Sequence, residues 1–312
     1  MSSTIPLNSL IDEFILKMRR GNKKDIKILS CEIADSLRKQ AGQNRIPINL
    51  NEILALRKIN DLILEKSRFN FQGELIPKRE GFSVILNSEH NQTRKRTTLA
   101  HEIGHTLFFD ISVMPPKRMI TYSKSEEWIC YDFGRCLLMP SEFVKKYVSI
   151  YNQTPPPRKI IDLTNLFEVS KDVFLMRITR DFQLWKDATI FLVEVNKNKL
   201  KVNKQSSHKG TRHTFTIDGK NGLIDHEKIK SFIQLLQIDQ KIQEIDETFS
   251  FKNKSYQIEM FRYSQNPVSV LCIIRDLNDE PIDVEKETTS NHIMDSNNEI
   301  VEKVQTTFEY YN

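Results

Sequence analysis

The segment His-Glu-Ile-Gly-His at residues 101–105 is the feature that most constrains what this chain can fold into. It lies in the run TTLAHEIGHTLFFD, which predicts a helix over about 97–109, capped by one of the two threonines at its start. Pro115-Pro116 forbids its continuation. Residues four apart on a helix lie about 40° from each other around the axis, so both imidazoles can reach one ion. Glu102 points to the rim of the same face, where it can accept a proton from water. The pattern therefore predicts a metal-dependent hydrolase. The alternative is that both histidines pack in the core or cap the helix.

A catalytic zinc site usually takes three protein ligands and keeps one position open, so a third ligand is required. The next predicted helix, over about 125–138, offers several candidates: Glu126, Glu127, Asp132, Cys130 and Cys136. A thiolate-rich site would indicate a structural metal rather than a catalytic one. Glu127 shares a helical face with Gly134, and this glycine would let the two helices approach closely. Position alone favours Glu127 only modestly over Glu126.

Length and composition exclude several classes of protein. A chain of 312 residues is typical of about two domains, and 39% hydrophobic with 28% charged residues excludes a wholly disordered protein. No run approaches the ~18–20 apolar residues of a membrane helix, and the basic residues of the first segment follow its apolar run, the reverse of a secretory signal. Four scattered cysteines are too few for a disulfide framework and fit a reducing cytoplasm. We therefore expect a cytoplasmic protein without membrane contact.

Apolar periodicity divides the chain into helical and strand-like segments. Helices are predicted over residues 8–40 with a break at Gly21-Asn22, and over NEILALRKINDLIL at 51–64. FNFQGELI and GFSVILN predict two strands joined by PKRE. TPPPRK at 154–159 predicts a rigid spacer before two short helices joined at Val169-Ser170. From residue 189 the pattern predicts a hairpin, a helix over 226–245 and two further strands, KSYQIEMFRYS and VSVLCIIRD.

The run RKRTTLAHEIGHTLFF followed by EWICYDFGRCLLMP resembles the ImmA/IrrE family of bacterial zinc endopeptidases. Residue by residue, the resemblance rests on Arg94 and Arg96 before the motif, on AHEIGH at 100–105, on Glu127 at the family's third zinc ligand, on Phe133-Gly134 at its Phe-Ala pair, and on LLMP at 137–140. It covers about residues 30–182. The sequence departs from the family pattern at Thr97 and at Cys130-Tyr131, which affects packing rather than ligands.

The resemblance and the change of apolar pattern near residues 183–188 together predict an α+β fold in two parts. The first is a mainly helical, zincin-like metallopeptidase domain over residues 1–183, with a small sheet and a helix-turn-helix-like segment at 160–182. The second is a smaller α/β domain over 188–312, a position where some family relatives carry a GAF-like domain. We expect it to be a sensor or regulatory domain with an acidic tail from about residue 276, much of it disordered.

The resemblance also implies an activity. Zn²⁺ would be held by His101, His105 and Glu127, and Glu102 would be the catalytic base for attack of water on a peptide bond. The implied substrate is a helix-turn-helix transcriptional repressor, whose cleavage derepresses stress-response or mobile-element genes. The alternative is a non-proteolytic metal-binding regulator that binds a partner protein or DNA, but such a scaffold has no need of Glu102.

The sequence also offers candidate contacts for DNA and for a reaction oxyanion. The segment LFEVSKDVFLMRI could contact DNA through Lys171, Arg177 and Arg180, but its apolar content favours packing, so nucleic acid is not the favoured partner. Tyr122 and Tyr131 could each supply a second stabiliser of the oxyanion. A buried, packing tyrosine is the favoured interpretation of both.

Overall fold

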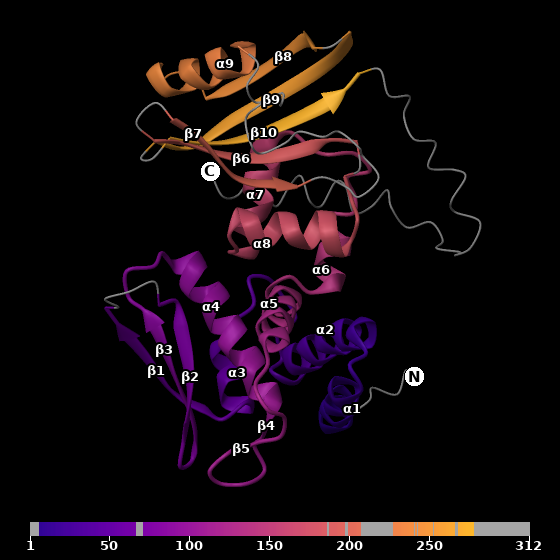
Figure 1. Cartoon of the computed structure of the whole chain (residues 1–312), viewed down its shortest axis with the longest axis vertical. Helices are drawn as coiled ribbons and strands as arrows, with labels where there is room; N and C mark the ends of the chain where they lie inside the picture. Colours follow the sequence, from indigo (N-terminus) through magenta and orange to yellow (C-terminus); the bar gives the residue numbers. More distant parts are fainter. Residues whose placement is uncertain are drawn as a thin grey trace, which may run out of the picture. The chain divides into compact units, whose positions relative to one another are not determined.

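The computed structural model describes residues 6–66, 71–185, 187–196, 199–206, 227–239, 241, 243–251, 253–265 and 268–277. These residues form a mixed α+β fold with a largely helical first part, a three-stranded sheet and a five-stranded sheet (Figure 1). In this part of the chain, no helix is both long and apolar enough to cross a membrane. The acidic tail predicted from about residue 276 lies almost entirely outside the described residues.

The first two helices, α1 (Leu7–Arg20) and α2 (Lys23–Gln40), are separated at the predicted break. Gly21 has a φ of 70°, a left-handed conformation that glycine adopts without steric cost. The Asn22 side chain accepts a hydrogen bond from the backbone N–H of Asp25 and caps α2. Most apolar residues of both helices are buried, as their helical spacing predicts, but Leu16 and Ile28 are 43% and 50% exposed.

A three-stranded sheet in the order β1-β3-β2 follows the short helix α3 (Asn51–Leu56). The strand β1 (Ile59–Glu65) runs parallel to β3 (Gly81–Asn87), and β2 (Gly73–Lys78) pairs antiparallel with β3. The predicted hairpin is therefore confirmed. The predicted helix over 51–64 is wrong after Leu56, because that half of the segment pairs with the central strand instead of continuing the helix.

The two helices expected to carry the chemistry are α4 (Gln92–His105) and α5 (Lys124–Leu138). A single 3₁₀ turn, Thr106–Phe108, ends α4, and a short strand pair, β4 (Phe109–Asp110) with β5 (Lys117–Arg118), leads to α5. The first helix begins at Gln92 rather than Thr97 because Asn91 is its cap. The Asn91 side chain accepts a hydrogen bond from the backbone N–H of Arg94.

The chain then forms α6 (Ser141–Tyr147), α7 (Pro157–Phe167), α8 (Lys171–Leu175) and a π-helical segment, Met176–Asp181. The predicted pair of short helices around Val169-Ser170 is confirmed, and the Ser170 side chain caps α8 by accepting a hydrogen bond from the backbone N–H of Val173. The predicted spacer ends earlier than expected, because Pro157 occupies the first turn of α7, where its missing N–H costs nothing.

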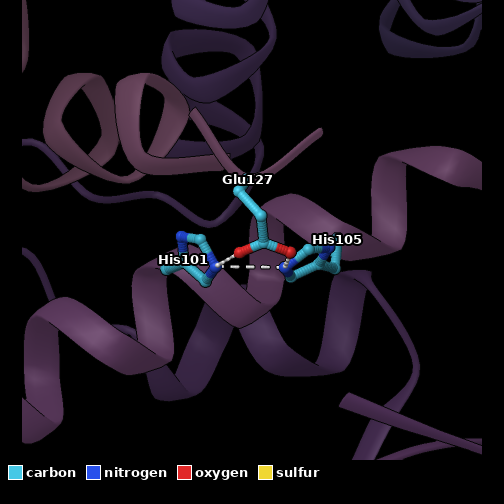
Figure 2. A group of neighbouring side chains, drawn as sticks. All are labelled: His101, His105 and Glu127. Carbon is cyan, nitrogen blue, oxygen red and sulfur yellow. Dashed lines mark hydrogen bonds and ion pairs between the residues drawn. The ribbon is translucent and has the colours of Figure 1, made fainter. Parts of the chain in front are cut away.

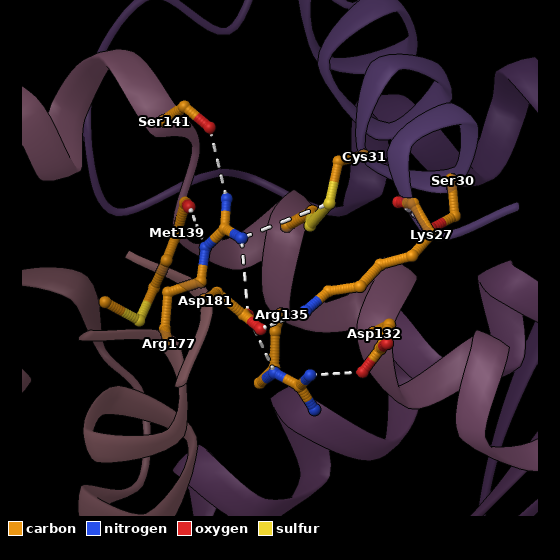
Figure 3. Close-up of a disulfide and its surroundings, with 10 residues drawn as sticks. Lys27, Ser30, Cys31, Asp132, Arg135, Met139, Ser141, Arg177 and Asp181 are labelled. Atoms are coloured by element: carbon orange, nitrogen blue, oxygen red, sulfur yellow. Dashed lines mark hydrogen bonds and ion pairs between the residues drawn. A yellow bond between two sulfur atoms is a disulfide. The ribbon is translucent and has the colours of Figure 1, made fainter. Parts of the chain in front are cut away.

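A buried ion-pair network joins α2, α5 and the π-helical segment (Figure 3). Asp181 lies 2.7 Å from Lys27 and 3.4 Å from both Arg135 and Arg177. Arg177 also donates to the carbonyl oxygen of Met139 at 3.1 Å and is only 3% exposed. Arg177 is therefore not available to a nucleic-acid phosphate, and the suggestion that it contacts DNA is wrong.

Cys31 of α2 and Cys136 of α5 form a disulfide beside this network, with Cα atoms 5.2 Å apart (Figure 3). The cysteine spacing does not reveal this pair, because the two residues are 105 positions apart and meet only through the packing of α2 against α5. Cys130 and Cys272 are free and buried.

The second sheet is antiparallel, with strand order β7-β6-β10-β9-β8. Its elements are β6 (Thr189–Asn196), β7 (Lys199–Ser206), α9 (Glu227–Ile238), β8 (Glu244–Phe251), β9 (Lys254–Gln265) and β10 (Val268–Asp276). The predicted hairpin and the last two strands are confirmed. The helix predicted over 226–245 is shorter, because its end forms the start of β8.

Alternate residues of the central strand β10 face two different cores. Val270 and Cys272 belong to a cluster with Ile233 of α9, whereas Leu271 belongs to the large cluster that includes Trp185 and the first half of the chain. One face of the sheet thus packs in a separate core with α9, and the other face belongs to the large core of the first half of the chain. A domain boundary near 183–188 and a GAF-like character for the second part remain predictions.

Candidate metal centre

Three side chains from α4 and α5 converge on one point (Figure 2). The Nε2 atoms of His101 and His105 are 3.0 Å apart. Glu127 places its Oε2 3.3 Å from His101 Nε2 and its Oε1 3.6 Å from His105 Nε2. One potential ligand atom from each residue lies within 4.8 Å of the others. The structure therefore brings together the three residues predicted as metal ligands.

The chemistry of this cluster fits a metal ion. Two imidazole nitrogens and a carboxylate form a donor set that Zn²⁺ takes in catalytic sites, where a fourth position stays open. Acceptor atoms that face one another at these distances repel unless a cation or protons lie among them. The three residues are thus suited to hold Zn²⁺.

Two glycines allow α4 and α5 to approach closely at this point. A Cβ atom on Gly104 would lie 3.1 Å from Cα of Cys130, and one on Gly134 would lie 3.3 Å from the backbone nitrogen of His101. Such distances are shorter than ordinary van der Waals contact. The close approach predicted from Gly134 is therefore present, and it carries Glu127 to the histidines.

Glu126 has a different role from its neighbour. Its Oε1 lies 2.8 Å from Nδ1 of His105, and its Oε2 pairs with Arg118. The Glu126 side chain is only 1% exposed. A carboxylate on Nδ1 fixes the imidazole with its proton on that nitrogen and its Nε2 lone pair toward the cluster. The sequence offers Glu126 as a rival to Glu127 for the metal and does not reveal this supporting contact.

The other candidate ligands are engaged elsewhere. Asp132 pairs with Arg135 within α5, and Cys136 is in the disulfide. Cys130 is fully buried, and burial raises the pKa of its thiol well above the usual range. None of these three side chains is part of the cluster.

Glu102 is buried beside the cluster and titrates near neutral pH. Burial raises the pKa of its carboxyl to about 7, against the opposing effect of His105. The backbone N–H of Leu75 in β2 donates to this carboxylate. A carboxyl group with a pKa near the working pH can accept and return a proton efficiently.

The two histidines differ in protonation when no metal is bound. Burial lowers the pKa of His101 to about 4, and the charge of His105 acts in the same direction. Burial would also lower the pKa of His105, but the hydrogen bond to Glu126 and the nearby carboxylates outweigh it and raise that pKa. His101 is therefore neutral at pH 7, the form that binds metal.

A cleft of about 1170 Å³ opens onto the cluster between β2, α4, α5 and the start of α8. Tyr122 and Tyr131 both line it, and they are 55% and 44% exposed. Tyr122 donates to Oε1 of Glu127 at 3.1 Å, and the ring of Tyr131 lies 4.2 Å from the His101 ring between centroids. The expectation that both are buried packing residues is therefore wrong, because the cleft runs directly over them.

Residues 64–179 match the family profile described as the IrrE N-terminal-like domain, Peptidase_M78. This segment is similar to an IrrE N-terminal-like domain. The match confirms the resemblance to the ImmA/IrrE family and includes α4, α5 and every residue of the cluster. The second sheet lies beyond it.

A Mycobacterium tuberculosis transcriptional regulator is similar in structure, with a TM-score of 0.45 and 12% sequence identity over 85% of this chain and 93% of that chain. Among curated proteins, none matches the sequence significantly. Because Peptidase_M78 is a metallopeptidase family, the match supports a metallopeptidase that acts on a protein substrate.

Proposed function

We propose that this protein is a zinc-dependent endopeptidase that cleaves a helix-turn-helix transcriptional repressor and so derepresses stress-response or mobile-element genes. The observation that carries the proposal is the buried carboxyl of Glu102 beside the cluster of His101, His105 and Glu127, inside an IrrE N-terminal-like domain.

In this proposal, each residue has a distinct task. His101, His105 and Glu127 would hold Zn²⁺, which when bound supplies Lewis-acid activation of water and of the peptide carbonyl. Glu102 accepts a proton from the attacking water and delivers it to the leaving amine nitrogen. Glu126 keeps the imidazole of His105 oriented.

The cleft supports a macromolecular substrate. Its walls are contributed by β2, the two long helices α4 and α5, and the α8 region, and two exposed tyrosines, Tyr122 and Tyr131, line it. An extended peptide segment fits such a groove, whereas a small metabolite is usually enclosed on most sides. The repressor itself is proposed from the family resemblance, and the cytoplasmic location from the cysteine usage and the first segment of the sequence.

We further propose that residues 188–312 are a sensor or regulatory domain. The five-stranded sheet contacts α8 beside the cleft, because the Lys171 ammonium lies 4.6 Å from the ring centroid of Tyr263 in β9. The neighbours of Lys171 in sequence, Ser170 and Asp172, both line the cleft. A change in the sheet could therefore reach the groove through α8.

The test is co-expression with the helix-turn-helix repressor encoded nearest to this gene, followed by a gel for fragments. Wild type should cut the repressor at one site, and Glu102→Gln should leave it intact while it retains metal, because an amide does not accept the proton. A metal-loaded wild type that binds the repressor without cutting it would favour the non-proteolytic regulator instead.

A further inference from the structure

Tyr122 holds a hydroxyl at the edge of the cluster. It lies in the loop between β5 and α5, and its O–H donates to Oε1 of Glu127 at 3.1 Å. The same oxygen lies 3.6 Å from Nε2 of His105. With 55% of its surface exposed in the cleft, Tyr122 can be contacted by a bound peptide.

Two other donors near the cluster, Arg118 and Tyr131, are less free to act on a substrate. Arg118 is paired with Glu126, and its guanidinium lies over the ring of Phe109 at 5.0 Å from the centroid. Tyr131 is fixed within α5, and its ring is packed against His101. Tyr122 lies in the loop before α5, so its hydroxyl can leave Oε1 of Glu127 and donate to an oxygen of the substrate instead.

We propose that Tyr122 is a catalytic residue that donates a hydrogen bond to the oxyanion formed on the scissile carbonyl. This role rests on the proposed peptidase function. When water oxygen bonds to the carbonyl carbon, the π electron pair moves onto the carbonyl oxygen, which becomes a far stronger acceptor than in the ground state. The phenol keeps its proton throughout and only shifts its hydrogen bond. The carbonyl re-forms as the C–N bond breaks and the amine leaves with the proton from Glu102.

A bond of this kind stabilises the transition state more than the bound substrate, so its loss lowers kcat rather than affinity. Removing one donor of an oxyanion costs on the order of 100- to 1000-fold in a water-excluded site. Because Tyr122 is half exposed, we expect a smaller loss of about 10- to 100-fold in kcat for Tyr122→Phe. This variant keeps the ring and removes only the hydroxyl.

The experiment uses the full chain and a quenched fluorescent peptide that spans the bond cut in the repressor. It compares wild type, Tyr122→Phe and, as the matched variant, Tyr131→Phe. Two readouts do not depend on turnover: zinc affinity by competition with a chromogenic chelator, and affinity for the uncut peptide in a Glu102→Gln background. For Tyr122→Phe, kcat should fall while both affinities stay within about twofold of wild type.

Three results would overturn the assignment. The first is a Tyr122→Phe variant with wild-type kcat, and the second is an equal or larger loss in Tyr131→Phe. The third is a loss of kcat that follows a weaker zinc affinity, which would make Tyr122 a positioning residue for Glu127. A wild type that does not cut, or a Glu102→Gln variant that does, refutes the proposed peptidase itself.

Discussion

Replacing Glu126 with glutamine should weaken zinc binding although Glu126 is not among the three proposed ligands. The substitution keeps the shape of the side chain but removes its charge. The amide oxygen can still accept from Nδ1 of His105, now more weakly, and the amide N–H₂ then faces Arg118, which is also a donor. Changes to such supporting contacts typically cost about 10- to 100-fold in metal affinity. Each factor of ten equals about 1.4 kcal/mol, so we expect a loss of about 1.4–2.7 kcal/mol.

The assay is competition for zinc with a chromogenic chelator at about pH 8, where protonated imidazole competes little with the metal. This pH matters because Glu126 itself raises the pKa of His105 in the metal-free chain. Glu89→Gln is the matched control, since Glu89 is 53% exposed and pairs with the exposed Lys66. It should bind zinc as wild type does. A Glu126→Gln variant that folds normally and binds zinc within twofold of wild type would refute the argument.

Three other changes, two substitutions and one truncation, test contacts elsewhere in the chain. Asp181→Asn should cost about 3–5 kcal/mol of stability at pH 7, because it breaks a buried ion-pair network. Burial would raise the pKa of Asp181, but Arg135, Lys27 and Arg177 outweigh it and lower that pKa below 3.8, so its contribution is present above that value and is lost as pH falls further. In urea melts, the difference from wild type should shrink toward about pH 3, while the exposed variant Asp12→Asn should show no such trend. Gly134→Val should lower stability by about 1–3 kcal/mol and weaken zinc binding by pushing α5 from α4; equal zinc affinity in Gly134→Val and wild type would contradict this. A chain ending at Asp187 should keep its zinc but cleave the repressor without a signal, and loss of zinc would show that the second sheet is part of the catalytic core.

The local parts of the site are predictable from the sequence because they depend on helix geometry. Two histidines four residues apart must share a face of α4. Glu127 follows the proline break, in the first turn of a helix, α5, that packs back against α4. The apolar spacing of α1 and α2, with the glycine between them, likewise fixes where each helix ends.

What the sequence does not reveal depends on packing between distant segments. The strand β1 has an apolar run that suits a helix or a strand, and only pairing with β3 decides between them. Glu126 and Glu127 lie about 100° apart around α5, and the packing of α5 against α4 puts one carboxylate on Nδ1 of His105 and the other near Nε2. The proximity of Cys31 and Cys136 arises in the same way from the contact between α2 and α5.

The most direct test of the central claim is the metal content of the protein purified without added metal. Elemental analysis should find one zinc per chain in wild type and in Glu102→Gln, because Glu102 is not a ligand in this account. The double variant His101→Ala, His105→Ala should contain almost none, since two of the three ligands are lost. Unchanged zinc in the folded double variant, or a wild type that binds no divalent metal, would contradict the account.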